Sequence, residues 1–388
     1  MRKAVIVSAV RTAIGRYGSM LASFRAPELG AIVIREVVKR ATLEASDIQE
    51  VIMGNVLSAG LGQAPARQAA IRADIPVEVG ALTINKVCGS GLKAVVLAAQ
   101  AIKLGEADFI VAGGMESMSN APYLVPKARF GYRMGDGKLI DAMQLDGLYD
   151  IYNNFAMVET GNIIAERFNL TREEVDAFAS RSHDRALASR EKFKEEIVPI
   201  EVPQRKKGPI LFDYDEGPRK SPPEVLAKLR PVGKGSIVTA ANASQLSDGA
   251  SALVVTSEEK AKEKGLPILA TIGDYVTSGT RPEWVMEAPI PGVRKLLERT
   301  GLTIKDFNLV EHNEAFASAS VAIQKDLSIP DDIFNINGGA VALGHPIGCS
   351  GARILTTLLY EMKRRNDKRG LATICLGGGN AVSMIVER

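Results

Sequence analysis

The sequence predicts an α/β protein made of two related halves that are separated by a long insertion. Helical runs of ten or more residues alternate with short runs rich in valine and isoleucine, such as 109–112 and 371–376. Short apolar runs of this kind are typical of strands buried on both faces of a sheet. Segments 37–48 and 296–307 repeat one order of apolar and charged residues, about 260 positions apart. We interpret this repeat as the result of a gene duplication.

Each half has the same landmarks in the same order. The first begins with the apolar run 4–10, interpreted as a strand because a charged residue follows it and no small-residue cleavage site does. Gly91 then opens a helix that is apolar almost all round, which predicts that the helix is buried. Gly351 opens the matching helix of the second half, and glycine pairs follow the next strand at 113–114 and 377–378.

The insertion, 119–246, has no counterpart in the repeat. It starts as a loop with glycines and tyrosines, contains a helix near 171–190, and becomes rich in proline and cations. Insertions of this size usually carry specificity. We therefore divide the chain into a first half (1–118 with 247–267), an inserted loop domain (119–246) and a second half (268–388).

Composition narrows the possible functions. Of the 388 residues, 46% are hydrophobic and 24% are charged, with a net charge of +3, which is ordinary for a soluble globular protein. No basic stripe with interleaved aromatics suggests nucleic acid, and we expect no membrane-spanning segment. Cys88, Cys349 and Cys375 have neither zinc spacing nor a C-x-x-C pair. This predicts free thiols in a reducing compartment, with the cytoplasm as the default, and no metal site.

Cys88 is the candidate nucleophile. It lies between an apolar run and the buried helix that Gly91 opens, and small residues surround it. The unpaired N–H groups and the positive dipole end of that helix predict a lowered thiol pKa. A lone cysteine in an apolar setting is more often an inert core residue, so partners for Cys88 must come from elsewhere in the chain.

Three histidines are available as a base. His345 lies in a glycine-rich loop that opens a helix, and Pro346 restricts its backbone, so we expect the loop to present this imidazole. We expect His183, mid-helix among charges, to be a solvated surface residue. The sequence leaves open whether His312 is structural or functional.

These residues suggest a mechanism. The repeat places Cys375, at a strand end before three glycines, in the half opposite Cys88, so both thiols are expected in one site. Cys88, activated by His345, would attack a thioester or ketone carbonyl, and Cys375 would move a proton at the neighbouring carbon. Asn313, at another strand end, would hold a water, and backbone N–H groups would stabilise oxyanions. Cys349 is interpreted as a packing residue.

Six ordered sequence blocks resemble those of the thiolases, the acetyl-CoA acetyltransferases and 3-ketoacyl-CoA thiolases. The blocks are NKVCGSG (85–91), GGMESMS (113–119), NAS (242–244), NEAFA (313–317), NGGA (337–340) with GHP (344–346), and CLGGG (375–379). The resemblance spans essentially the whole chain. It implies a duplicated fold of two βαβαβαββ halves in five layers (αβαβα) with an inserted loop domain, assembled as homodimers or homotetramers.

The resemblance also implies roles for single residues. Cys88 would carry the acyl group, His345 would activate Cys88 and line a first oxyanion hole with a water held by Asn313, and Cys375 would be the acid and base for the α-carbon. The N–H groups of Cys88 and Gly377 would form a second oxyanion hole. The implied reaction is acyl transfer between thioesters: thiolysis of a 3-ketoacyl-CoA to acyl-CoA and acetyl-CoA, or the reverse Claisen condensation.

Coenzyme A would then be a substrate, with no other cofactor, and the loop domain would hold it. Ser244 matches a serine that bonds the pantetheine arm, Arg219 an arginine near the nucleotide, and Met157 and Met286 methionines of the acyl pocket. Ala315 and Phe316 belong to the same substrate site. Further cations for the phosphates are Arg205, Lys206, Lys207, Lys220, Lys228 and Arg230.

The sequence departs from the family pattern beside the expected acyl pocket. It reads AMV at 156–158 where many biosynthetic thiolases read His-Met-Gly, and MEAP at 286–289 is one residue shorter than the common Met-Gly-x-Gly-Pro. The last turn reads GNA at 379–381 in place of Gly-Met-Gly. These changes leave acyl chain length, branching and reaction direction open.

Two other interpretations remain. A ketoacyl synthase or hydroxymethylglutaryl-CoA synthase would share the duplicated fold and the cysteine nucleophile, but such enzymes usually lack the second cysteine in a Cys-x-Gly-Gly-Gly turn. A catalytically silent subunit of a multienzyme complex would keep the fold and use the altered loops as a partner surface.

Overall fold

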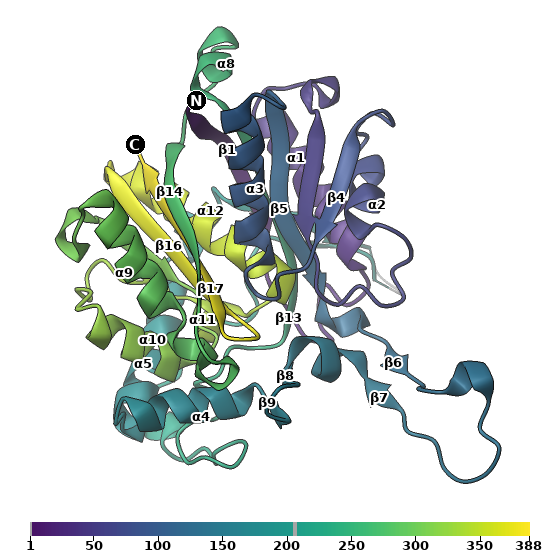
Figure 1. Ribbon diagram of the computed structural model, residues 1–388, viewed down its shortest axis with the longest axis vertical. Coiled ribbons are helices and arrows are strands. Elements are labelled where there is room, and N and C mark those ends of the chain that lie inside the picture. Colours follow the sequence, from purple (N-terminus) through teal and green to yellow (C-terminus); the bar gives the residue numbers. More distant parts are fainter. Residues whose placement is uncertain (1, 205–207) are drawn as a thin grey trace.

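The structure is a computed structural model that describes residues 2–204 and 208–388 (Figure 1). Within this part of the chain, two halves with matching element order surround a pair of central helices. Strands and helices of the first half run in the order βαβαβαββ. They are β1 (Ala4–Thr12), α1 (Ala26–Arg40), β3 (Glu50–Gly54), α2 (Pro65–Arg72), β4 (Gly80–Ile84), α3 (Ser90–Leu104), β5 (Phe109–Ser117) and β13 (Ser247–Ser257).

The second half repeats this order with one reduced strand. Its elements are β14 (Ala270–Gly279), α9 (Pro289–Thr300), β15 (Leu309–His312), α10 (Ala317–Asp326), α11 (Ala340–Leu343), α12 (Ile347–Arg365), β16 (Arg369–Leu376) and β17 (Asn380–Glu387). The counterpart of β4 is a single parallel bridge between Val310 and Phe334. Even the short 3-10 turns before the second strands correspond, at Ala45–Asp47 (η1) and Ile304–Asp306 (η6).

The strands pair in mirrored order. The path is β15-β16-β17-β14-β1-β13-β5-β3-β4, with the short β10 (Ile197–Val198) beside β1 and β2 (Gly15–Arg16) beside β13. β3 runs parallel to β4 and β5, and β15 runs parallel to β16, whereas β13 and β17 are antiparallel to their neighbours. Only Val5 and Ile6 of β1 pair with β14, so the two half-sheets meet along a short seam.

Helices cover both half-sheets and fill the space between them. α1 and α2 pack on the outer face of the first half-sheet, and α9 packs on β14, β16 and β17 of the second. Between the half-sheets, α3 contacts β3, β5 and β13, while α12 contacts α3 and strands of both halves (Figure 1). All nine residues of β1 and of β5 are buried, as expected for strands enclosed by helices on both sides.

The two central helices touch at a pair of glycines. A Cβ on Gly91 would lie 2.7 Å from the backbone nitrogen of Ala352. A Cβ on Gly351 would likewise collide with the backbone nitrogen of Leu92. Only glycine permits two backbones to approach so closely. The contact lies in the first turns of α3 and α12, so it brings the two helix starts, and the loops that precede them, to one place.

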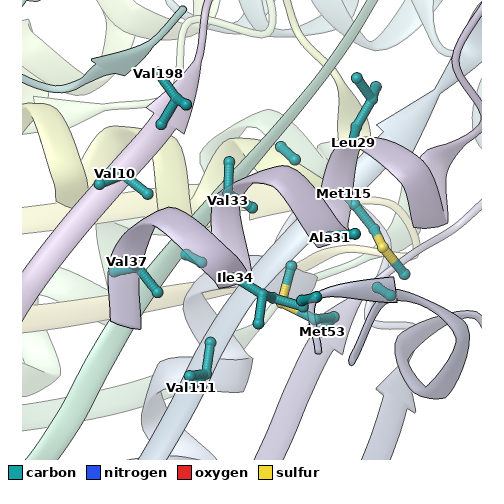
Figure 2. Close-up of a cluster of buried hydrophobic side chains, with 14 of the residues drawn as sticks. Val10, Leu29, Ala31, Val33, Ile34, Val37, Met53, Val111, Met115 and Val198 are labelled. Carbon is teal, nitrogen blue, oxygen red and sulfur yellow. The ribbon is translucent and has the colours of Figure 1, made fainter. Parts of the chain in front are cut away.

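The outer layer of the first half is a conventional apolar core. Figure 2 shows Ile34 of α1 facing Met53 of β3 and Val111 of β5. Gly30 on the same helix lets the backbone approach the side chain of Met115. Burial of these side chains contributes roughly 1.5–3 kcal/mol for each fully buried large apolar residue.

Segment 87–104, which includes α3, is long and apolar enough to cross a membrane by length and composition alone. More than half of this segment is buried inside the protein. Contact with the first half-sheet and with α12 therefore accounts for its apolar character.

The insertion wraps around the end of the molecule at which the sheets' loops converge. Its elements are β6 (Tyr123–Leu124), β7 (Ile140–Asp141), η4 (Met143–Gly147), β8 (Tyr149–Asp150), β9 (Phe155–Ala156), α4 (Val158–Arg167), α5 (Arg172–Ala188), α6 (Arg190–Phe193), β10, β11 (Ile200–Val202), β12 (Ile210–Phe212) and α7 (Pro223–Leu226). The segment joining β6 to β7 extends away from the body (Figure 1). A short helix, α8 (Glu258–Glu263), follows β13. The division of the chain at 118, 246 and 267 stays a prediction.

Candidate active site

Cys88 lies in a strained turn immediately before α3. Val87 has φ +46°, a left-handed conformation that β-branched residues rarely adopt. Two side chains hold the turn: Asn85 Oδ1 accepts from the Val87 N–H at 2.9 Å, and Ser90 Oγ accepts from the Lys86 N–H at 2.8 Å. Ser90 also donates to the Val87 carbonyl at 2.6 Å. The turn therefore presents the thiol at the start of the helix, as the sequence predicted.

The predicted direction of the Cys88 pKa is wrong. Burial raises this pKa strongly, and the neighbouring Cys375 thiol raises it further. Hydrogen bonds from the N–H groups of Gly377 and of Cys88 itself act in the opposite direction but do not offset burial. The resting group is a thiol, so a base must remove its proton before it can attack a carbonyl.

His345 is placed to be that base. Ser350 donates its hydroxyl to the Pro346 carbonyl at 2.9 Å, and the same oxygen lies 2.5 Å from His345 Nδ1. Because that oxygen uses its proton on Pro346, it accepts the Nδ1 proton, which leaves the lone pair on Nε2. Burial, and then the charge of Arg353, lower the pKa of His345 to about 3, so the ring is neutral near pH 7.

Asn313 completes the surroundings of His345. It directly follows β15, the strand end at which the sequence placed it, and its Nδ2 lies 3.5 Å from His345 Nε2. Its Oδ1 is buried and has no hydrogen-bond partner among the described residues. That oxygen can accept a hydrogen bond from a bound water, which fits the role that the sequence suggested.

A buried carboxylate that the sequence reasoning missed supports the His345 loop. Glu116, at the end of β5, accepts from the N–H groups of Val56, Leu57 and Gly348 at 2.8–3.1 Å. Burial raises its pKa to about 7, although these N–H groups lower it. The carboxylate thus ties the loop after β3 to the first turn of α12. Its position after a glycine pair, in the block GGMESMS, was the available signal.

Cys375 approaches from the opposite half. It is the second-to-last residue of β16, and its Sγ is 3.7 Å from the Met286 Sδ. Burial raises its pKa to about 12, so this group also rests as a thiol. The turn that follows reverses the chain through Gly378 and Gly379, at φ +83° and +81°, and directs the Gly377 N–H toward Cys88.

These groups line one inner chamber of about 60 Å³. The predicted residues that line it are Cys88, His345, Cys375, Gly377, Ser244, Met157, Met286, Ala315 and Phe316. Asn313 lies behind His345 and is not on the chamber wall. The two cysteines, one from each half, therefore share one chamber, as the repeat predicted.

The chamber opens into an outer cavity of about 540 Å³. Ser244, Met157 and His345 line both spaces. Two of the unusual residues, Ala156 and Val158, line the outer cavity, whereas Asn380 and Ala381 lie in β17 and line neither.

None of the predicted loop-domain cations that the structure describes lines the outer cavity. Arg219 does not line it; its pKa is lowered by burial and then by the charge of Arg16, which does line the cavity. Arg16 was missed because it lies in the first half, far from the insertion in sequence. Lys220, Lys228 and Arg230 are exposed on the surface, and the predicted cations Arg205, Lys206 and Lys207 lie outside the described residues.

The other histidines and the third thiol are buried. The prediction that His183 is solvated is wrong, because its side chain is fully buried and Nδ1 accepts from the Arg219 N–H at 3.4 Å. Burial lowers the pKa of His312 to about 3; its ring stacks on Phe334 and bonds Ser320 at 3.0 Å, which is a structural role. Cys349 is buried in α12, and all three cysteines are free thiols, as predicted.

Across residues 2–204 and 208–388, no group of three or more histidine, cysteine, aspartate or glutamate side chains is arranged to hold a metal ion. The chemistry of the chamber is that of thiols, an imidazole and backbone N–H groups. A duplicated fold that places two thiols and an imidazole in one chamber between its halves defines an acyltransferase that works with cysteine.

Comparison with known proteins specifies that class. The family profile "Thiolase, N-terminal domain" matches residues 4–259, and "Thiolase, C-terminal domain" matches residues 266–388. The chain belongs to the thiolase family. This confirms the family and the fold class that the sequence predicted, and it does not favour a ketoacyl synthase or a silent subunit.

Individual relatives agree over the full length. The chain is 52% identical to an acetyl-CoA acetyltransferase of Pseudomonas aeruginosa and 51% identical to one of Cupriavidus necator, with all of each chain covered. The crystal structure of the Bacillus anthracis acetyl-CoA acetyltransferase superposes with a TM-score of 0.97 at 41% identity, covering 100% of this chain and 99% of that one.

Proposed function

We propose that this thiolase transfers an acetyl group between thioesters, cleaving acetoacetyl-CoA with CoA to two acetyl-CoA or running the reverse Claisen condensation. The relatives that match over their full length are named acetyl-CoA acetyltransferases. The observation that carries the proposal is the meeting of Cys88, His345 and Cys375 in one small chamber.

In thiolysis, Cys88 attacks the 3-keto carbon. His345 Nε2 takes the thiol proton as the Cys88 sulfur forms its bond to carbon, and the imidazolium then donates to the new oxyanion together with a water on Asn313. Collapse of this adduct breaks the C2–C3 bond and leaves an acyl group on Cys88 and the enolate of acetyl-CoA. His345 thereby serves first as base and then as hydrogen-bond donor.

Cys375 handles the carbon acid. Its thiol protonates the C2 carbon of the enolate, whose oxygen is held by the N–H groups of Cys88 and Gly377, and acetyl-CoA leaves. The Cys375 thiolate then takes the thiol proton of the incoming CoA, which attacks the acyl group on Cys88. The bond from the acyl carbon to Cys88 breaks, acyl-CoA leaves, and His345 returns its proton to the Cys88 sulfur. A thiol with a pKa near 12 is protonated at rest, which suits the first of these steps.

The outer cavity is proposed to hold the pantetheine arm, with Ser244 bonding it. Met157, Met286, Ala315 and Phe316 would enclose the acyl group. Arg16, which lines the outer cavity, and Arg219, whose pKa the charge of Arg16 lowers, would meet the phosphates at the outer end. Coenzyme A is then a substrate, and no other cofactor enters the steps above.

A thiolysis panel tests this function. Purified protein, with CoA, is expected to cleave acetoacetyl-CoA with a kcat/KM at least about tenfold above that for 3-ketohexanoyl-CoA, because added methylenes must fit a small chamber. Loss of 3-ketoacyl-CoA absorbance gives the rates, and 2-methyl-acetoacetyl-CoA tests branching. Failure to cleave any 3-ketoacyl-CoA, with CoA still bound, would contradict the proposal.

We also propose a homo-oligomeric, cytoplasmic enzyme of fatty acid metabolism. The three free thiols support a reducing compartment. The arm 123–141 exposes large apolar side chains, including Phe130 at 89% and Met134 at 96% exposure, which suits contact with another copy. We propose this arm as the contact between two dimers of a homotetramer.

Shortening the arm is therefore expected to change the assembly. A variant that joins Leu124 to Ile140 through a short glycine-serine linker should elute in gel filtration with light scattering as a dimer, whereas the parent elutes as a tetramer. Replacing only Phe130 and Met134 by serine is the milder matched variant. A parent that is a monomer, or a shortened variant that remains a tetramer, would refute the assignment.

A further inference from the structure

Two walls of the inner chamber are carried by elements that meet on the protein surface. Met157 caps the start of α4, and Met286 lies in the 3-10 segment η5 (Pro282–Glu287); both side chains line the chamber. α4 packs directly against η5. A change in how these two elements pack can therefore move the two methionine side chains relative to each other.

A set of three side chains, Arg167, Trp284 and Glu287, fastens α4 to η5. Arg167, the last residue of α4, forms two bonds with the Glu287 carboxylate: Nη2 to Oε2 at 3.2 Å, and a shorter bond from Nε to Oε1. Its guanidinium also lies over the Trp284 ring, 3.9 Å from the centroid. The edge of the planar Arg167 guanidinium pairs with the Glu287 carboxylate, while its face stacks on the Trp284 indole. Both binding modes of a guanidinium are therefore used at once.

Both η5 and the chain just before it contact the catalytic turn. The Thr280 N–H donates to the Gly379 carbonyl at 2.7 Å, and Met286 contacts the Cys375 thiol. A Cβ on Gly379 would lie 2.5 Å from the Thr280 carbonyl oxygen, so the two strands of chain are in close contact. Moving η5 away from its place would therefore disturb both the chamber wall and the second thiol.

Glu287 belongs to the part of the sequence that departs from the family pattern. It follows Met286 in the segment MEAP, which by the resemblance to the thiolases is one residue short. In this chain the position thus supplies a carboxylate, and the shorter segment ends against α4. The departure that the sequence analysis left open has a defined structural consequence.

We propose that Arg167, Trp284 and Glu287 form a clamp that restricts the acyl chain that the chamber accepts. This inference rests on the proposed function and specifies its substrate. An acyl group longer than acetoacetyl must push Met157 and Met286 apart, and these residues lie on the two elements that the clamp joins. Opening the clamp breaks the Arg167–Glu287 bonds and the stacking on Trp284. The binding free energy of each longer substrate is therefore less favourable by the free energy of these contacts.

Binding measurements test the clamp without requiring turnover. In a Cys88→Ala background, which cannot be acylated, calorimetry gives the dissociation constants of acetyl-CoA and hexanoyl-CoA. With Arg167→Ala or Glu287→Gln added, the ratio of the hexanoyl-CoA to the acetyl-CoA constant is expected to fall about fivefold. Arg294→Ala, which removes an exposed ion pair with Asp326 on α9 and α10, is the matched control and should leave the ratio unchanged.

The chain has one tryptophan, Trp284, whose ring lies beside the guanidinium groups of both Arg167 and Arg281, so its fluorescence reports on the clamp and its immediate surroundings. Hexanoyl-CoA should shift the emission in the parent background, because it separates Arg167 from the ring, while acetyl-CoA should not. Arg167→Lys keeps the charge but loses the planar stacking, so it should lower the ratio as Arg167→Ala does. It serves as the test variant if the folding of Arg167→Ala is impaired.

The outcomes separate the two proposals. If the clamp variants are folded and have the same ratio of hexanoyl-CoA to acetyl-CoA dissociation constants as the parent, the clamp is refuted. This conclusion does not depend on the activity of the enzyme in turnover. A lowered ratio that Arg294→Ala reproduces would also overturn it, since the effect would then be unspecific. The proposed function is judged separately, by thiolysis in the protein that retains Cys88.

Discussion

Replacing Cys88 by alanine is expected to lower the rate of thiolysis at least about 10⁴-fold, because Cys88 is the group that carries the acyl intermediate and Cys375 is assigned to the proton transfer at C2. The protein should remain folded, since the side chain is small and lies at the chamber wall. Intact-mass measurement after incubation with acetyl-CoA should show acylated parent protein and unmodified variant.

Cys349→Ala is the matched control for this variant. Cys349 lies at the start of α12, the position in the second half that corresponds to the surroundings of Cys88, and it does not line the chamber. It should retain activity within about threefold, the range of a small change in a core side chain. Equal losses in both variants would point to general damage, and acylation of Cys88→Ala would refute the assignment of the nucleophile.

Replacing Cys375 by alanine is expected to separate the two half-reactions. Overall thiolysis should fall by about 10²- to 10⁴-fold, the usual contribution of a general acid and base. Acylation of Cys88 by acetyl-CoA should persist at a lower rate, because His345 still activates Cys88 and CoA can leave as a thiolate without the proton from Cys375. Exchange of the acetyl-CoA methyl protons with deuterated water, followed by NMR, should be present in the parent and lost in the variant.

His345→Ala is the informative comparison for the Cys375 variant. It should lose acylation as well as turnover, because the Cys88 thiol, with its raised pKa, then has no base. If Cys375→Ala also fails to become acylated, the separation of roles proposed for the two sides of the chamber is incorrect. Proton exchange that persists without Cys375 would place the acid and base elsewhere.

Much of the fold could be predicted from the sequence because both halves show the same local order of apolar, charged and glycine residues. The correspondence of Gly91 with Gly351 follows from the repeat alone, and the structure shows why both must be glycine: the two helix backbones touch there. Strand ends at Asn313 and Cys375 were predicted because buried parallel strands are short apolar runs that end in polar residues or glycines.

Local patterns could not give the charge states. The helix start predicted a lowered pKa for Cys88, yet burial and the second thiol raise it. The sequence around His183 is highly charged, which predicted exposure, but the side chain is fully buried in the folded protein. Desolvation depends on what packs against a group from distant parts of the chain, and a local window contains none of that information.

The sequence by itself thus determined the two halves, the family and the residues Cys88, His345, Asn313 and Cys375, because each carries a short pattern that chemistry or packing requires. Only the tertiary structure decided how they act together. It joined Glu116 to the His345 loop, set Arg16 at the outer cavity, and fastened Arg167 to Glu287 across 120 positions of chain. Contacts between residues so far apart depend on how the elements pack, and no local pattern encodes that packing.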